Sequence, residues 1–441
     1  MYLGRDKPCR IQYPANTDKS DPYMKRNAFI VLLIFLIFFV ISFLTNVLGP
    51  LIPDIIDSFH LSIGLAGFLP FSFFVAYGVM SIPSGILIEK YSEKTVTLTG
   101  FLLAFVAALI FALVPTFEVA LISLFSIGIG MAMLQVVINP LLRQAGGEEN
   151  FAFNSVLAQL FFGSASFLSP LLYKYLVNNI HTDNNEPLIL LFNNLVPPNI
   201  KWVSLYWVFA LTALLMVVTI MLVRFPKVEL KEEERMDTGT GFRSLLANKY
   251  VWLFFLGIFA YVGTEQGIAN WTSKFLQLYH GADPSTTGAD ILSYFWGLLT
   301  VGCFLGLIIL KLVDSRLVLI GAAVCTMITL AFALFGSLEV ALVCFPLTGF
   351  FLSVMWSIVV SLGLNSVPRH HGTFSGILCT GIAGGAVVPL IIGGLAELVG
   401  LQIAMLMLFV TLGYILSVGI WAKPLVNNAT IKNWRDVFKF S

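Results

Sequence analysis

Apolar runs of about twenty residues, separated by short polar segments, dominate the pattern along this chain. Each run is long enough to cross a hydrocarbon core of about 30 Å as a helix. We count twelve of them, at residues 28–52, 63–87, 95–115, 118–142, 152–177, 202–224, 250–275, 289–311, 316–336, 339–364, 373–396 and 401–422. The pattern predicts an all-α membrane protein with twelve transmembrane helices.

Two connections between runs are long. Residues 178–200 are rich in Asn and Pro, whereas residues 225–248 are strongly charged and divide the runs six and six. Runs 5 and 11 share a pattern of small residues, so we expect two pseudo-symmetric six-helix bundles. The expected organisation is a tail at 1–27, bundles at 28–224 and 249–422, a linker at 225–248 and a tail at 423–441.

Lys and Arg residues gather on one side of the predicted membrane, together with both termini and the linker. Because positive residues are enriched in cytoplasmic loops, we expect both termini in the cytoplasm and residues 178–200 outside. The short loops fit a multi-pass protein of a bacterial inner membrane.

Composition narrows the function classes. The chain is 58% hydrophobic and 11% charged, with a net charge of +1, whereas a soluble domain is about a quarter charged. There is no basic block typical of nucleic-acid binding, and the cysteines lack metal-ligand spacing. We therefore expect a lipid bilayer around the chain, no nucleic-acid partner, no metal and no cofactor, and a monomer is sufficient.

Glu265 is the deepest charged residue in any predicted span, within the apolar stretch 251–278. A carboxylate at bilayer depth costs several kcal/mol unless it is protonated, paired or facing water. Glu265 is therefore a candidate for a solute or ion pathway, and a purely structural hydrogen bond is the alternative.

The loop after the second run contains a spaced motif, Gly85, Glu89, Lys90 and Lys94, with Ser92 at a position of the pattern that is usually Gly. Gly85 permits tight packing, and the charged side chains can bind helix ends. The spacing resembles the Gly-x-Leu-x-acid-basic-x-Gly-x-basic loop of the major facilitator superfamily and predicts a cytoplasmic latch between the halves. A positively charged turn without latch function is the alternative.

Further elements resemble one branch of that superfamily, the fucose–galactose–glucose:cation symporter family. The similarity runs over most of residues 28–422. Its clearest elements are Leu134-Gln135…Asn139-Pro140, Val156-Leu-Ala-Gln159, Tyr261-Val-Gly-Thr-Glu265…Trp271 and Phe374-Ser-Gly-Ile-Leu-Cys379. The resemblance implies a secondary transporter that imports a hexose-like sugar by alternating access, coupled to a proton or sodium ion.

The chain departs from this family at several places, including Leu352 and Ser357, where the family has Asn and Pro. Three departures replace a charged residue. Gly49 stands where the proton symporters have Asp, Gln135 where the fucose symporter has Glu, and Cys303 where the family usually has Arg. Neither Gly49 nor Gln135 can carry a proton, so Glu265 is left as the ion-coupling candidate.

Sugar hydroxyls need amide and carboxylate partners, and sugar C–H faces need flat aromatic walls. The predicted spans contain such residues, and we expect the substrate site to draw on Asn46, Gln135, Asn139, Gln159, Glu265, Gln266, Asn270, Trp271, Trp296 and Trp356. Buried amides can also serve only as links between helices. That structural role is favoured for Asn139, which precedes Pro140, and simple packing stays open for the tryptophans.

Four rival functions stay open. The chain could be an uncoupled sugar facilitator, a transporter of another small polar metabolite, a non-transporting receptor or a membrane-embedded enzyme. The enzyme is disfavoured because the sequence has no Walker loop, no HExxH and no nucleophile elbow with its partners.

Overall fold

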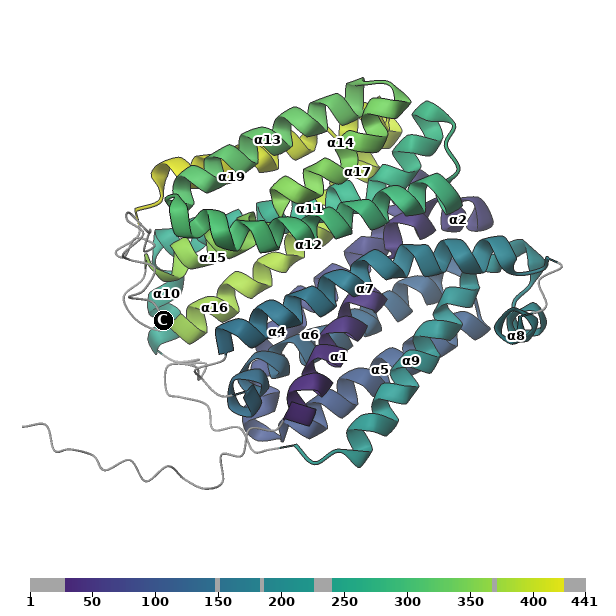
Figure 1. Cartoon of the computed structure of the whole chain (residues 1–441), viewed down its shortest axis with the longest axis horizontal. Coiled ribbons are helices and arrows are strands. Elements are labelled where there is room, and N and C mark those ends of the chain that lie inside the picture. Colours follow the sequence, from purple (N-terminus) through teal and green to yellow (C-terminus); the bar gives the residue numbers. More distant parts are fainter. Residues whose placement is uncertain (1–27, 147–150, 183–185, 226–239, 367–370, 424–441) are drawn as a thin grey trace, which may run out of the picture.

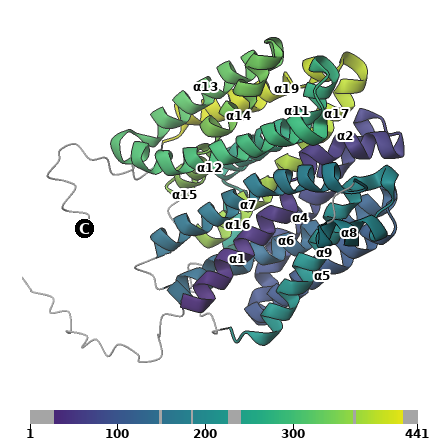
Figure 2. The ribbon, with the colours of Figure 1, turned by 45° about the vertical axis from the view of Figure 1, so that its right-hand side comes forward.

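The computed structural model describes residues 28–146, 151–182, 186–225, 240–366 and 371–423, and within these ranges it contains helices and no strand. Twelve helical segments are long and apolar enough to cross a membrane, which confirms the predicted number. Figures 1 and 2 show them as two bundles packed against each other, with α12 running along α7 at the boundary.

The first bundle contains α1 to α9. Its helices are α1 (Ala28–Thr45), α2 (Leu48–Phe59), α3 (Ile63–Ala66), α4 (Phe68–Lys90), α5 (Glu93–Leu113), α6 (Phe117–Gly146), α7 (Phe151–Asn179), α8 (Pro187–Leu195), the 3-10 helix η2 (Pro198–Val203) and α9 (Ser204–Leu222). Helix α8 lies within the long segment 178–200.

The second bundle follows α10, a short helix inside the predicted linker. Its helices are α10 (Thr240–Leu246), α11 (Lys249–His280), the π-helix η4 (Pro284–Gly288), α12 (Ala289–Leu312), α13 (Ser315–Phe335), α14 (Leu338–Leu352), α15 (Met355–Leu364), α16 (His371–Thr380), the 3-10 helix η5 (Gly381–Ala383), α17 (Gly384–Val399), α18 (Leu401–Ala404) and α19 (Met407–Trp421).

Two faces of the molecule are useful landmarks. We call the face where α1 begins and α19 ends the termini face, and the opposite face, where α8 lies, the α8 face (Figure 1).

Three of the interrupted membrane spans have their break at the central cavity. The first span breaks at Asn46–Val47 between α1 and α2, the tenth at Ser353–Val354 between α14 and α15, and the eleventh at η5. Helix interruptions at membrane depth are tolerated where the backbone lines a cavity or is buried in protein. Residues at all three breaks line the central cavity described below.

The first span is longer than predicted. It ends at Phe59 rather than at residue 52, because α2 continues the helix through Asp54 and Asp57 after the apolar run has ended. The polar residues ended the apolar run early, although Ile55 and Ile56 between them are buried and Asp57 is exposed.

Candidate functional site

A cavity of about 510 Å³ lies between the two bundles. This volume is within the range usual for small-molecule sites, about 300–1,000 Å³. Its walls come from α1, α4, α6, α7, α11, α12, the break between α14 and α15, and η5. These helices belong to spans 1, 2, 4, 5, 7, 8, 10 and 11.

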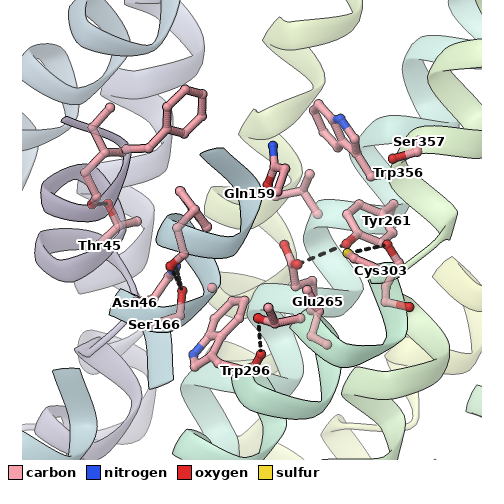
Figure 3. A pocket seen from close by; sticks show the side chains of 18 of the residues that line it. Thr45, Asn46, Gln159, Ser166, Tyr261, Glu265, Trp296, Cys303, Trp356 and Ser357 are labelled. Carbon is pink, nitrogen blue, oxygen red and sulfur yellow. Dashed lines mark hydrogen bonds between the residues drawn. The ribbon is translucent and has the colours of Figure 1, made fainter. Parts of the chain in front are cut away.

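Glu265 faces this cavity from α11 (Figure 3). The Tyr261 hydroxyl donates to its Oε1 over 3.0 Å, because residues four apart share one face of a helix. The Tyr261 ring packs at 6.0 Å from that of Trp356. Cys303 lies beside Tyr261 and Glu265 (Figure 3), and its thiol donates to the Ser353 carbonyl oxygen over 3.3 Å.

The opposite wall carries a hydrogen-bonded cluster that joins α1 to α7. The Asn46 amide donates to Ser166 Oγ over 2.9 Å and to Ser42 Oγ over 3.3 Å. The Ser42 hydroxyl donates to the Phe162 carbonyl oxygen over 2.6 Å. Asn46 therefore both lines the cavity and holds two helices of one bundle together.

Gln135, Gln159 and Trp296 complete the polar part of the lining. Trp296 is 4% exposed, and its indole Nε1 has no hydrogen-bond partner among the described residues. Buried donors are nearly always paired in native proteins. This indole N–H is itself covered in the present arrangement, so a rotation of the Trp296 side chain would be needed before it could donate to a hydroxyl of a bound solute.

The structure places seven of the ten predicted substrate residues at this cavity: Asn46, Gln135, Gln159, Glu265, Gln266, Trp296 and Trp356. The side chain of Asn139 lies outside the described residues.

Asn270 and Trp271 lie elsewhere, so their assignment to the pocket is corrected. Trp271 is fully buried and its indole donates to the Pro389 carbonyl oxygen over 3.0 Å. Asn270 is 2% exposed and is not part of the cavity lining, and its amide donates to Oε1 of Gln266 over 3.5 Å. Helix α11 is enclosed on most sides, and the sequence cannot show which buried side meets the cavity.

The sequence reasoning also missed several polar residues of the lining. They are Thr45, Tyr77, Ser166, Tyr261, Thr300, Cys303, Ser353 and Ser357. The four-residue spacing between Tyr261 and Glu265 was a signal that could have identified Tyr261.

The bundles touch each other at the α8 face. Nζ of Lys174 on α7 donates to both carboxylate oxygens of Asp290 on α12, at 2.8 and 2.6 Å. The Gly64 backbone N–H at the start of α3 donates to Glu397 on α17 over 2.9 Å.

A third contact is looser, with Lys274 on α11 4.0 Å from Asp57 on α2. On the other side, the cavity lining extends along α12 as far as Leu310, near its last residue, Leu312. The cavity is therefore closed toward the α8 face and extends toward the termini face.

Comparison with known proteins identifies the family. The model of the Major Facilitator Superfamily matches residues 34–389. The chain belongs to this superfamily. It is 29% identical to the glucose/galactose transporter of Brucella abortus, over 92% of this chain and 97% of that protein. It is 26% identical to the L-fucose-proton symporter of Escherichia coli, over 82% and 86%.

Solved structures show the same fold. The E. coli fucose:proton symporter matches with a TM-score of 0.64 at 21% identity, covering 90% of this chain and all of that one. A bacterial homolog of the human lysosomal transporter Spinster, in an inward-facing and unoccupied conformation, matches with a TM-score of 0.72 at 16% identity, over 91% and 97%.

Gly49 has a packing role in this member of the superfamily. A Cβ atom at Gly49 would collide with the backbone carbonyl oxygen of Ala269 on α11. The position is therefore a close approach of the two bundles, with no room for an acidic side chain in this arrangement.

Asp54 is a second carboxylate within the first span, so Glu265 is not the only one near membrane depth. The Tyr173 hydroxyl, itself fully buried, donates to Asp54. The predicted end of the span at residue 52 had left Asp54 outside the membrane.

In the loop motif of the superfamily, Lys94 is bonded to another helix. Nζ of Lys94 donates to the carbonyl oxygens of Met221 and Val223, at 2.9 and 2.8 Å, and so binds the end of α9. This contact stays within the first bundle. The side chains of Glu89 and Lys90 lie outside the described residues, and a latch between the halves, with Gly85 at its start, stays a prediction.

Proposed function

We propose that this protein imports a hexose-like sugar by alternating access. The observation that carries the proposal is the placement of Glu265, four amides and two indoles around one cavity between the bundles. Amides and carboxylates suit sugar hydroxyls, and indoles suit sugar C–H faces. The named sugar transporters among its relatives support the same substrate class.

The proposed orientation has both termini in the cytoplasm of a bacterial inner membrane, on the basis of Lys and Arg placement. The termini face is then cytoplasmic, and the arrangement described here is the inward-facing one. In the proposed cycle, the contacts at the α8 face separate to admit sugar from outside. They close again as the cavity opens toward the cytoplasm, and the protein works as a monomer.

We further propose that Glu265 couples transport to a cation, either a proton or sodium. A carboxylate at a cavity between two alternating halves can exchange a cation with whichever side is open. An uncoupled facilitator is the second candidate, because Gly49 is packed against Ala269 and leaves no acid at that point of span 1.

Uptake of radiolabelled hexoses into proteoliposomes tests the proposal, with a proton gradient, a sodium gradient or neither. We expect accumulation with one gradient and its loss in Glu265→Gln, while Ser357→Ala, at the same cavity, keeps it. Equilibration without accumulation would favour the facilitator. No uptake of any hexose would refute the sugar assignment.

A further inference from the structure

The cavity has an unbalanced charge. Among the described residues that line it, Glu265 is the one carboxylic acid, and none is Lys, Arg or His. The hydrogen bond from the neutral Tyr261 hydroxyl stabilises the carboxylate without neutralising it. A charge in a cavity shielded from bulk water acts more strongly than at the surface, because the effective dielectric constant is lower.

Aromatic and sulfur groups surround this carboxylate. Figure 3 shows Glu265 between Trp296 on one side and Tyr261 and Cys303 on the other, with Trp356 beyond Tyr261. A carboxylate forms its strongest hydrogen bonds with charged donors. The faces of Trp and Tyr rings attract ammonium groups. The site thus has two features that favour a positive group, and its described lining contains no cationic side chain that would pair with a negative one.

We propose that Glu265 selects the sugar by charge, and that the cavity binds protonated amino sugars more tightly than neutral hexoses and rejects sugar acids. This rests on the proposed function. The ammonium group of an amino sugar would pair with Glu265. A neutral hexose lacks this group, so a separate proton or sodium ion would balance Glu265 instead. One positive charge would then move with each sugar in both cases.

The selectivity can be measured with sugars of one ring size. Glucosamine, glucose and glucuronate compete for binding to the purified full-length protein at pH 7, where an amine with a pKa near 8 is about 90% protonated. We expect glucosamine to bind about tenfold more tightly than glucose, and glucuronate to bind at least tenfold more weakly. In Glu265→Gln, glucosamine and glucose should bind equally, and glucuronate should gain affinity.

Two further variants test the role of the charge. Cys303→Lys places a cation beside an intact Glu265, and we expect it to abolish the preference for glucosamine and to admit glucuronate. Glu118→Gln makes the same change at an exposed carboxylate outside the cavity, and it should leave the order of the three sugars unchanged. Loss of the order in Glu118→Gln would mean that the order does not depend on the charge in the cavity.

Transport gives an independent readout. Glucosamine uptake into proteoliposomes should respond to membrane potential and be insensitive to proton or sodium gradients, whereas glucose uptake should require one of the gradients. If glucose binds and glucosamine shows no advantage, or if the order persists in Glu265→Gln, the charge inference is overturned and the proposed function stands. If none of the three sugars binds, the proposed function itself fails.

Discussion

Breaking the ion pair between Lys174 and Asp290 should shift the protein toward opening at the α8 face. This pair joins α7 of one bundle to α12 of the other through two hydrogen bonds. Both bonds must be lost when the bundles separate there. The Asp290→Asn variant removes the charge while keeping the size of the side chain.

The magnitude follows from the exposure of the pair. The side chains of Lys174 and Asp290 are 34% and 30% exposed, so the pair is half-buried. A solvated surface pair contributes about 0.2–1 kcal/mol. In a buried pair, loss of one partner costs about 3–5 kcal/mol. An intermediate value of about 1.5 kcal/mol corresponds to roughly a tenfold shift between the two arrangements.

Spin labels at Asn178 on α7 and Tyr294 on α12 would report the separation at the α8 face, since both side chains are exposed. We expect Asp290→Asn to increase the population with long distances about tenfold. The doubly reversed variant, Lys174→Asp with Asp290→Lys, should restore most of the short-distance population. An unchanged distance distribution in Asp290→Asn would refute the role of this pair in closing the face.

Three further predictions concern single side chains. Gly49→Ala should disfavour closure at the α8 face by about 1–3 kcal/mol, because the added Cβ meets the Ala269 carbonyl oxygen. The same spin-label distances measured in this variant check the prediction, and unaltered closure would contradict it. Ser166→Ala should lower the free energy of unfolding by about 1 kcal/mol, because the hydrogen bond from Asn46 is lost. The change is measured as a lower melting temperature in detergent, and an unchanged melting temperature would show that the bond contributes little. Trp296→Phe should weaken sugar binding several-fold, by about 1 kcal/mol. The melting temperature should not change, because the indole N–H has no partner among the described residues. Equal affinity for the sugar would exclude a hydrogen bond from this indole to it.

Local spacing is informative where the site depends on a single helix. Tyr261 and Glu265 meet because four residues make about one helical turn, although Tyr261 was not among the predicted site residues. Gln266 lies next to Glu265 and also reaches the cavity. The same local reasoning failed one turn later, at Asn270 and Trp271. Nothing in the periodicity distinguishes a side chain buried between helices from one that lines a cavity.

Departures from the family pattern had two different meanings. Gly49 looked like a missing acid, and the structure adds a steric reason for the glycine. Cys303 looked like a missing base, and the structure places it near Glu265, so that its identity bears on the charge of the cavity. Only the contacts with other helices show that Gly49 has a packing role whereas Cys303 lies beside the cavity carboxylate.

The sequence by itself determined the twelve spans and the deep position of Glu265, because lipid requires apolar helices of nearly constant length and penalises a carboxylate inside them. Only the tertiary structure decided which buried polar groups share one cavity, where span 1 ends and which face of the molecule is closed. The physical reason is that these properties depend on packing between segments far apart in the chain. Asp290 bonds to a lysine 116 residues earlier, and Gly49 touches α11.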